Sequence, residues 1–264
     1  MNRYEFRYMH RGVQLDYPAE QDKSLLRSVQ IQNKGKKKAL LLLHGFSSSP
    51  AVYRQLIPLL PAYQAIVCPV LPGHADSIKA FSQAQAAEWL STAEQHCQQL
   101  MLSYQQIDVL GLSLGGLLAS HLAQKFSLNH LFLLAPALRL QVSVRQTLAL
   151  FRCLSKLGFI ELRNKAGNLL APLAAELSYR RVPLSAFISI LEMLQTYEWE
   201  PPACPTDVFL GLHDEVVDSQ AVDQLFRGRP QTEIHWLTDS AHVLPLDNDY
   251  QLIANCIAQR FSSN

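Results

Sequence analysis

The chain has 264 residues, of which 48% are hydrophobic and 17% are charged. This balance supplies enough apolar side chains for a sizeable core and excludes the composition of a disordered protein. Because 23 lysines and arginines nearly match 22 aspartates and glutamates, the net charge is only +1, which gives no general footprint for nucleic acid. We therefore expect a globular protein of enzyme size that does not bind nucleic acid.

The cysteines are odd in number and scattered, with no CxxC pair and no ligand spacing to histidine: Cys68, Cys97, Cys153, Cys204 and Cys256. They predict neither a disulfide framework nor a zinc site, and we expect no metal and no organic cofactor. The first residues lack the continuous apolar stretch of a secretory signal, and no apolar run approaches the roughly 20 residues of a membrane span. These features predict a cytoplasmic protein without a transmembrane segment.

The amino-terminal residues 4–9 and 13–17 alternate between apolar and polar side chains around Gly12, which predicts an antiparallel hairpin. Apolar runs separated by helical stretches follow, as is typical of parallel β-α-β units. We expect strands within residues 39–45, 65–73, 107–111, 130–137, 206–214 and 232–237. Helices are expected near residues 51–60, 84–104, 115–126, 219–226 and 249–261. The sequence thus predicts an α/β fold with a mostly parallel central sheet flanked by helices.

Residues 139–204 interrupt this alternation. About 65 residues separate two predicted strands there, far more than the usual connection of 2 to 6 residues. Residues 144–157 and 184–197 carry apolar side chains at helical spacing, and no run in the segment resembles a strand. We expect a helical cap inserted into a core made of residues 1–138 and 205–264.

The strongest local signal is the run GLSLGG around Ser113, placed between an apolar strand and a helical stretch. It matches the nucleophile elbow, GxSxG, in which a tight turn from strand to helix exposes the serine. Small residues must stand two positions before and after the serine because larger side chains would clash, and Gly111 and Gly115 fill both positions. We expect Ser113 to be a nucleophile.

A serine hydroxyl needs a base within hydrogen-bond reach, and the base needs an orienting group. Apart from His121 on the following helix, four histidines come after the serine: His130, His213, His235 and His242. Packing on the sheet explains His130 and His235, which lie in predicted strands. His242 lies in a polar loop between the last strand and the last helix, which favours it as the base.

Asp214 is the preferred orienting acid. It ends a predicted strand, so it should emerge at the same sheet edge as Ser113 and His242. Asp218 and Asp239 are alternatives, although Asp218 also fits the N-cap of the helix that begins at Ser219.

An oxyanion hole in such a site uses the backbone N–H after the nucleophile and another from the loop after the first central strand. The N–H groups of Leu114 and Phe46 fit these two positions, and Gly45 lets the backbone bend before Phe46.

Five motifs occur in a familiar order: HGFSSSP, LPGHADS, GLSLGG, LGLHDEVV and SAHVLPLD. Over residues 39–260 the chain resembles the α/β-hydrolase superfamily, especially carboxylesterases and monoacylglycerol lipases. Leu112 and Leu114 stand where monoacylglycerol lipases often have His and Met, so the esterase-like form is the better match. We interpret His74 of LPGHADS as structural.

The resemblance implies a serine hydrolase that forms an acyl-enzyme. Ser113 would be the nucleophile, His242 the base and then the acid, and Asp214 the orienting group. The N–H groups of Phe46 and Leu114 would be the oxyanion donors. We expect the substrate to be a carboxylic ester of short to medium acyl chain, such as a monoacylglycerol.

Residues 139–190 carry eight basic and two acidic side chains, whereas the rest of the chain is net negative. This charge could steer an anionic ester, a phospholipid surface or an acidic carrier protein to the site, or it could simply solvate the outer face of the cap. The apolar faces of the predicted cap helices favour an acyl chain beneath them.

Two alternatives follow from these features. A thioesterase or acyl-carrier-protein ester hydrolase would use the basic cap for docking. A non-catalytic ligand-binding protein of the same fold is the other alternative, because fold does not settle function.

Overall fold

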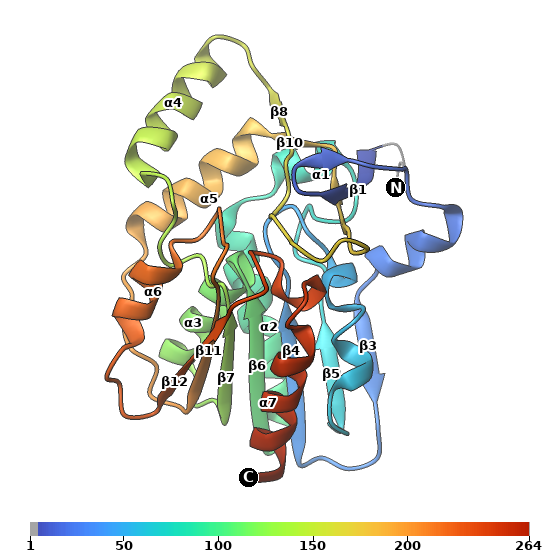
Figure 1. Cartoon of the computed structure of the whole chain (residues 1–264), viewed down its shortest axis with the longest axis vertical. Helices are drawn as coiled ribbons and strands as arrows, with labels where there is room; N and C mark the ends of the chain where they lie inside the picture. Colours follow the sequence, from blue (N-terminus) through green and yellow to red (C-terminus); the bar gives the residue numbers. More distant parts are fainter. Residues whose placement is uncertain (1–4, 264) are drawn as a thin grey trace.

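The computed structural model describes residues 5–263 and places a seven-stranded sheet at the centre of the molecule (Figure 1). The strands stand in the order β12-β11-β7-β6-β4-β5-β3, and every neighbouring pair is parallel except β3 with β5. Their bounds are β3 Val29–Gln32, β4 Lys38–Leu43, β5 Ala65–Cys68, β6 Gln106–Leu112, β7 His130–Leu134, β11 Thr206–Gly211 and β12 Thr232–Leu237. The expected α/β fold and its six predicted strands are confirmed. The edge strand β3 was not predicted, because VQIQ is short and half polar.

The central strand β4 shows why the sheet is buried on both faces. Its side chains are all buried and alternate between two cores: Leu41 and Leu43 pack into one, and Leu40 and Leu42 into the other. A strand covered by helices on both sides needs such a continuous apolar run.

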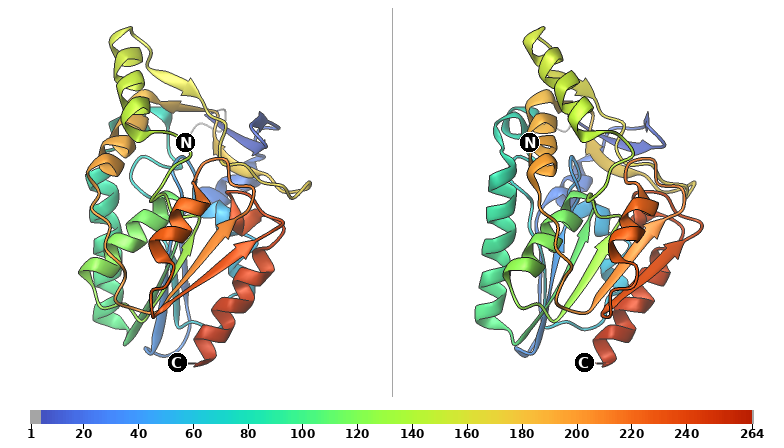
Figure 2. Two further views of the ribbon diagram at one scale, coloured as in Figure 1. Left: turned by 60° about the vertical axis from the view of Figure 1, so that its left-hand side comes forward. Right: turned by 90° about the vertical axis from the view of Figure 1, so that its left-hand side faces the viewer.

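Helices cover the two faces of the sheet (Figure 2). On one face lie α2 (Ala86–Ser103), α3 (Leu114–Lys125) and α6 (Ser219–Phe226), and on the other lies α7 (Tyr250–Ser263). These four elements match predicted helices. The expectation of a helix at residues 51–60 is wrong. This stretch instead forms two short 3-10 helices, η3 (Pro50–Tyr53) and η4 (Ile57–Leu59), because proline does not fit the interior of a continuous α-helix.

The remaining short helices lie in connections. They are η2 (Glu20–Leu26), α1 (Ile78–Gln83) and η5 (Leu244–Leu246). Ser77 caps α1 by accepting a hydrogen bond from the N–H of Ala80.

The predicted amino-terminal hairpin is present as β1 (Phe6–His10) and β2 (Val13–Gln14), joined by Arg11 and Gly12. Both turn residues have positive φ, as a hairpin turn of type I′ requires. Tyr4, the first residue of the predicted hairpin, lies outside the described residues.

Residues 139–204, which we call the inserted segment, connect β7 to β11. Most of the segment lies beyond the carboxyl ends of the sheet strands, and the residues after its last helix run down the side of the sheet to the start of β11 (Figure 1). The inserted segment contains α4 (Val144–Lys156), β8 (Glu161–Arg163), β9 (Glu176–Tyr179), β10 (Arg181–Pro183) and α5 (Leu184–Thr196). The two predicted helices are confirmed, but the expectation of no strands is wrong. β9 pairs with β1 from the amino terminus, and β8 pairs with β10, so these strands are stabilised by pairing rather than by a long apolar run.

Over residues 5–263, no helix is both long enough and apolar enough to cross a bilayer.

Candidate functional site

The turn around Ser113 has the geometry of a nucleophile elbow. Ser113 stands between β6 and α3 with φ 54° and ψ −113°, a strained backbone conformation for a residue other than glycine. A Cβ atom at Gly111 would lie 2.1 Å from the carbonyl oxygen of Gly115, and one at Gly115 would lie 1.9 Å from that of Leu43. Both glycines are therefore required by the close packing of this turn, as the sequence predicted.

A cavity of about 150 Å³ opens beside Ser113 at the carboxyl edge of the sheet. It is lined by residues from the sheet edge and from the inserted segment: Gly45, Phe46, Ser47, Leu112, Ser113, Asn164, Ala166, Gly167, Glu176, Phe187, Val216, His242 and Val243. The structure thus brings Ser113, His242 and Phe46 to one cavity.

His242 is held by Asp214. The Nδ1 atom of His242 lies 2.8 Å from Oδ2 of Asp214, and both residues are buried. The other oxygen of Asp214 accepts hydrogen bonds from the N–H groups of Val216 and Val217, at 2.8 and 2.9 Å. A carboxylate fixed in this way leaves Nε2 of His242 free to exchange a proton with a reactant.

Burial by itself lowers the pKa of His242, but the negative charges of Asp214 and Glu176 outweigh it, so the pKa is raised above its usual value. Within residues 5–263, no hydrogen bond joins the Ser113 hydroxyl to the His242 ring. Such contacts are often long without substrate and tighten when it binds.

The two alternative acids lie elsewhere. Asp218 caps α6, where its carboxylate accepts a hydrogen bond from the N–H of Ala221 at 2.9 Å. Asp239 is exposed, and its backbone carbonyl accepts a hydrogen bond from the side chain of Asn248. Of the three candidates, only Asp214 contacts His242 among the described residues.

The loop that carries Phe46 is braced by His44. The N–H of Leu71 donates to Nε2 of His44 at 3.1 Å, so Nδ1 carries the proton and donates to the carbonyl of Gly45 at 2.9 Å. Burial lowers the pKa of His44 to about 4, which keeps the ring neutral at physiological pH. His44 therefore positions the loop.

The two predicted oxyanion donors lie at this edge of the sheet. Leu114 is the first residue of α3, where helical N–H groups have no partner within the helix. The Phe46 ring packs against Phe81, Trp89 and Phe187, and His74 is buried in the same aromatic cluster. This placement agrees with the structural interpretation of His74.

Sequence reasoning missed the polar residues that the inserted segment contributes to the cavity. Glu176 on β9 is a buried carboxylate that lines the cavity, where the N–H of Gly167 donates to it at 3.3 Å. Burial raises the pKa of Glu176, although the charges of His242 and Arg54 act in the opposite direction.

Two asparagines of the inserted segment also brace the site. The amide of Asn164 donates to the hydroxyls of Ser47 and Ser178, which ties the Phe46 loop to β9. The carbonyl of Asn168 accepts from the backbone of His242 at 3.0 Å, and its side chain donates to the carbonyl of His213. No motif marks these residues, because each acts through a contact between distant parts of the chain.

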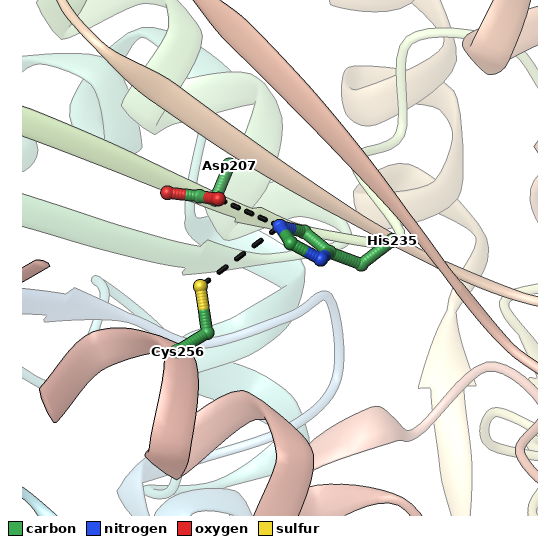
Figure 3. Close-up of side chains that lie close together, drawn as sticks. All are labelled: Asp207, His235 and Cys256. Atoms are coloured by element: carbon green, nitrogen blue, oxygen red, sulfur yellow. Dashed lines mark hydrogen bonds and ion pairs between the residues drawn. The ribbon is translucent and has the colours of Figure 1, made fainter. Parts of the chain in front are cut away.

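A second cluster of polar side chains lies among β11, β12 and α7 (Figure 3). Asp207, His235 and Cys256 place an oxygen, a nitrogen and a sulfur within 4.8 Å of one another, and these donor types can bind a metal such as zinc. His235 lies 2.6 Å from Asp207, with Cys256 at 3.9 Å from the same ring nitrogen.

Arg260 also donates to both oxygens of Asp207, at 2.9 Å each, and His130 contacts one of them at 2.7 Å. Burial would raise the pKa of Asp207, but the hydrogen bonds from His130, His235 and Arg260 hold it well below its usual range. The cluster is therefore built as an ion-pair network that joins three strands to α7, which agrees with the structural interpretation of His130 and His235.

Comparison with known proteins supports this description of the fold. Residues 40–255 match the model of the alpha/beta hydrolase family. A thermostable monoacylglycerol lipase of Bacillus sp. (strain H-257) is 28% identical over 226 residues, covering 81% of this chain and 86% of that protein.

Two solved structures show the same arrangement. One, described for the metagenome-derived lipolytic enzymes LipS and LipT, has a TM-score of 0.79 at 24% identity and covers 91% of this chain and 98% of that chain. The monoacylglycerol lipase of Paleococcus ferrophilus has a TM-score of 0.68 at 17% identity, covering 89% and 99%. The family match spans most of the sequence and agrees with the observed fold, so the chain belongs to the alpha/beta hydrolase family.

Proposed function

We propose that the protein is a serine hydrolase that cleaves carboxylic esters through an acyl-enzyme. Ser113 is the nucleophile, His242 the base and then the acid, and Asp214 the orienting group. The observation that carries the proposal is the shared cavity of Ser113 and His242, with Asp214 bonded to the far nitrogen of the ring.

In the first half of the reaction, Nε2 of His242 takes the proton of the Ser113 hydroxyl as its oxygen attacks the ester carbonyl. The protonated ring then gives this proton to the departing alcohol, leaving the acyl group on Ser113. In the second half, His242 takes a proton from water as the water oxygen attacks the acyl carbonyl. The ring then returns this proton to the Ser113 oxygen as the bond between that oxygen and the acyl group breaks and the carboxylic acid leaves. Asp214 favours the charged ring in both halves by accepting from Nδ1.

The N–H groups of Phe46 and Leu114 are the proposed oxyanion donors. Donors already in place before the reaction stabilise the developing negative charge at little cost in reorganisation. The hydrogen bonds of His44 hold the loop of Phe46, which supports this role.

The lining of the cavity supports an ester with an apolar acyl group and a polar alcohol. Phe46 and Phe187 provide aromatic walls, whereas Asn164 and Glu176 provide polar groups. A volume of about 150 Å³ is below the range of roughly 300 to 1,000 Å³ typical of drug-sized ligands, which favours short to medium acyl chains. The Bacillus relative is named a monoacylglycerol lipase, and a glycerol alcohol fits the polar side of this cavity.

Residues 139–204 are proposed to act as a cap on a core of residues 1–138 and 205–264. Five residues that line the cavity of Ser113 support this division because they come from the inserted segment: Asn164, Ala166, Gly167, Glu176 and Phe187.

The cytoplasmic location predicted from the sequence is tested by cell fractionation.

A thioesterase that acts on a carrier protein is the second candidate. The exposed cations Arg145, Lys156 and Arg163 on the inserted segment favour it, because an acidic carrier would be attracted to them. Turnover of an acyl-carrier substrate that falls steeply with salt would support this candidate over a free-ester enzyme.

Hydrolysis of p-nitrophenyl esters from acetate to palmitate, with 1-monoacylglycerols of matched chain length, tests the proposal. We expect turnover to peak at one short or medium chain length and to disappear in Ser113→Ala. A folded wild-type protein that hydrolyses none of these esters would contradict it.

A further inference from the structure

The turn that follows α4 presents three large apolar side chains to solvent. Leu157, Phe159 and Ile160 are 70%, 52% and 79% exposed. Gly158 between them has a φ of +90°, and a Cβ built at this position would meet no atom within 4 Å. We call Leu157, Phe159 and Ile160 the apolar tip.

The side chains of the apolar tip are not part of the hydrophobic core. On the inner side of α4, Leu148 is buried and Phe151 packs on Phe187 of α5, with 5.3 Å between the ring centroids. On the outer side, Leu150 is 55% exposed. Helix α4 thus has apolar side chains on both sides, although only one of them faces the protein.

The apolar tip lies at one extremity of the molecule. In all three views, α4 and the turn after it project from the body on the side opposite the carboxyl terminus (Figures 1 and 2). Adjacent apolar side chains exposed at a protruding turn are a feature of surfaces that bind another apolar phase or protein.

Cations flank the apolar tip. Lys156 precedes it at the end of α4, and Arg163 follows it at the end of β8; both are exposed. Arg163 stands directly opposite Arg181 across the β8–β10 pair. Like charges in this position repel each other, so an anion bound beside them would stabilise the pair.

The positive charge of Arg181 is compensated by an ion pair with Glu161, in which Nη1 of the arginine lies 3.0 Å from Oε1 of the glutamate. In the part of the chain that the structure describes, neither Lys156 nor Arg163 takes part in an ion pair. The surface therefore combines exposed apolar side chains with uncompensated positive charge, which complements a membrane with anionic headgroups.

We propose that the apolar tip and its flanking cations dock the protein on an anionic phospholipid surface. Leu157, Phe159 and Ile160 enter the boundary between headgroups and acyl chains, while Lys156 and Arg163 contact the phosphates. The contact between Phe151 and Phe187 links this surface to the cavity of Ser113, since Phe187 lines that cavity. Docking itself requires no turnover and does not depend on the proposed hydrolysis.

Co-sedimentation with vesicles tests the proposal. The probes are vesicles of phosphatidylcholine alone and of phosphatidylcholine with 30% phosphatidylglycerol, at low and high salt. The variants are the triple change Leu157→Ser, Phe159→Ser, Ile160→Ser and the double change Lys156→Gln, Arg163→Gln. Leu102→Ser is the matched control, because Leu102 is 84% exposed but lies on α2 near the start of β6, at the other end of the sheet.

We expect wild type and Leu102→Ser to bind the anionic vesicles. The triple variant should bind them at least tenfold more weakly at either salt concentration. The double variant should bind severalfold more weakly at low salt and like wild type at high salt, where charges are screened. Hydrolysis of p-nitrophenyl acetate in the absence of vesicles should be the same for all four proteins, which shows that the variants fold.

Three results would overturn the proposal. The first is wild-type protein that binds neither kind of vesicle, and the second is a triple variant that binds vesicles as tightly as wild type. The third is wild-type protein that is a dimer in solution while the triple variant is a monomer, since the apolar tip would then be an interface between copies of the chain.

Discussion

The carboxylate of Glu176 lies in the same buried cavity as the imidazole of His242 and raises its pKa. Glu176 lies on β9 within residues 139–204, and His242 lies in the loop after β12. The inserted segment therefore affects the proton affinity of the proposed base as well as the shape of the cavity.

This relationship predicts a pH dependence. The base must be neutral to act, so kcat/KM should rise with pH through an apparent pKa above the ordinary histidine value of about 6.5. Glu176→Gln removes a negative charge that favours the protonated ring, so the acidic limb of the profile should move to lower pH. Profiles measured with p-nitrophenyl butyrate check this. An unchanged limb, or one displaced to higher pH, would refute the coupling.

Glu176→Gln should also affect the alcohol side of the substrate. If Glu176 accepts a hydrogen bond from a polyol, KM should rise for a monoacylglycerol and change little for the matched p-nitrophenyl ester, which lacks those hydroxyls. Equal changes in KM for the two substrates would show that Glu176 does not bind the alcohol part of the substrate.

Asp214→Asn should lower kcat by roughly four orders of magnitude with the fold retained, because an amide at this position favours the wrong tautomer of His242. Asp218→Asn is the matched control, since Asn is as good an N-cap as Asp and should leave both activity and stability almost unchanged. Ester turnover and thermal unfolding of both variants test this. A large loss of kcat in Asp218→Asn alone would show that the acid is assigned incorrectly.

Gly167 limits the position of the base. A Cβ atom there would lie 2.7 Å from Cδ2 of His242 and 2.6 Å from Cγ2 of Val243. Gly167→Ala should displace the ring from its present position and lower kcat by about 10 to 100-fold, because small displacements of reacting groups have large effects on rate. Steady-state kinetics with a thermal unfolding control check this. Wild-type kcat in the folded variant would show that the ring has room to move.

The ion pairs of Asp207 should stabilise the fold. Removing one partner of a buried pair leaves the other charges uncompensated, so Asp207→Asn should lower the free energy of unfolding at pH 7 by about 3 kcal/mol. Glu233→Gln also removes a partner of Arg260, but that side chain is 60% exposed, and the expected loss is below about 1 kcal/mol. Denaturant unfolding of both variants measures the difference. Equal losses would contradict the ion-pair interpretation.

The low pKa of Asp207 determines how its contribution to the stability of the fold changes with pH. Its pKa in the folded protein lies below the value of about 3.9 expected in the unfolded chain, so its contribution is complete above about pH 5 and is lost as the pH falls. Wild type should therefore lose more stability than Asp207→Asn between pH 5 and pH 3. Parallel losses in the two proteins would indicate that other carboxylates control acid unfolding.

The sheet and the core of the site follow from local patterns. Strands such as β4 are continuous apolar runs because both faces are buried, and Gly111 and Gly115 mark a turn that admits no other residue. The choice of His242 and Asp214 depends only on their position after the last strands, which a parallel sheet brings to one edge.

The residues of the inserted segment that line the cavity could not be predicted from such local patterns. Glu176 lies on β9, which pairs with β1 at the amino terminus, and Asn164 and Gly167 form hydrogen bonds with residues of β9. Their positions therefore depend on a pairing between residues far apart in the sequence. The short strands of the inserted segment carry no periodic signal, so neither the strands nor the side chains they position could be inferred from the sequence.

The measurement that tests the account most directly is covalent labelling with diethyl p-nitrophenyl phosphate, an organophosphate that transfers its diethylphosphoryl group to an activated serine. We expect one adduct per chain by intact mass, peptide mapping that places it on Ser113, and loss of ester turnover in proportion to labelling. Ser113→Ala should gain no adduct. An adduct on another residue, or full inhibition that leaves Ser113 unmodified, would contradict the proposal that Ser113 is the nucleophile.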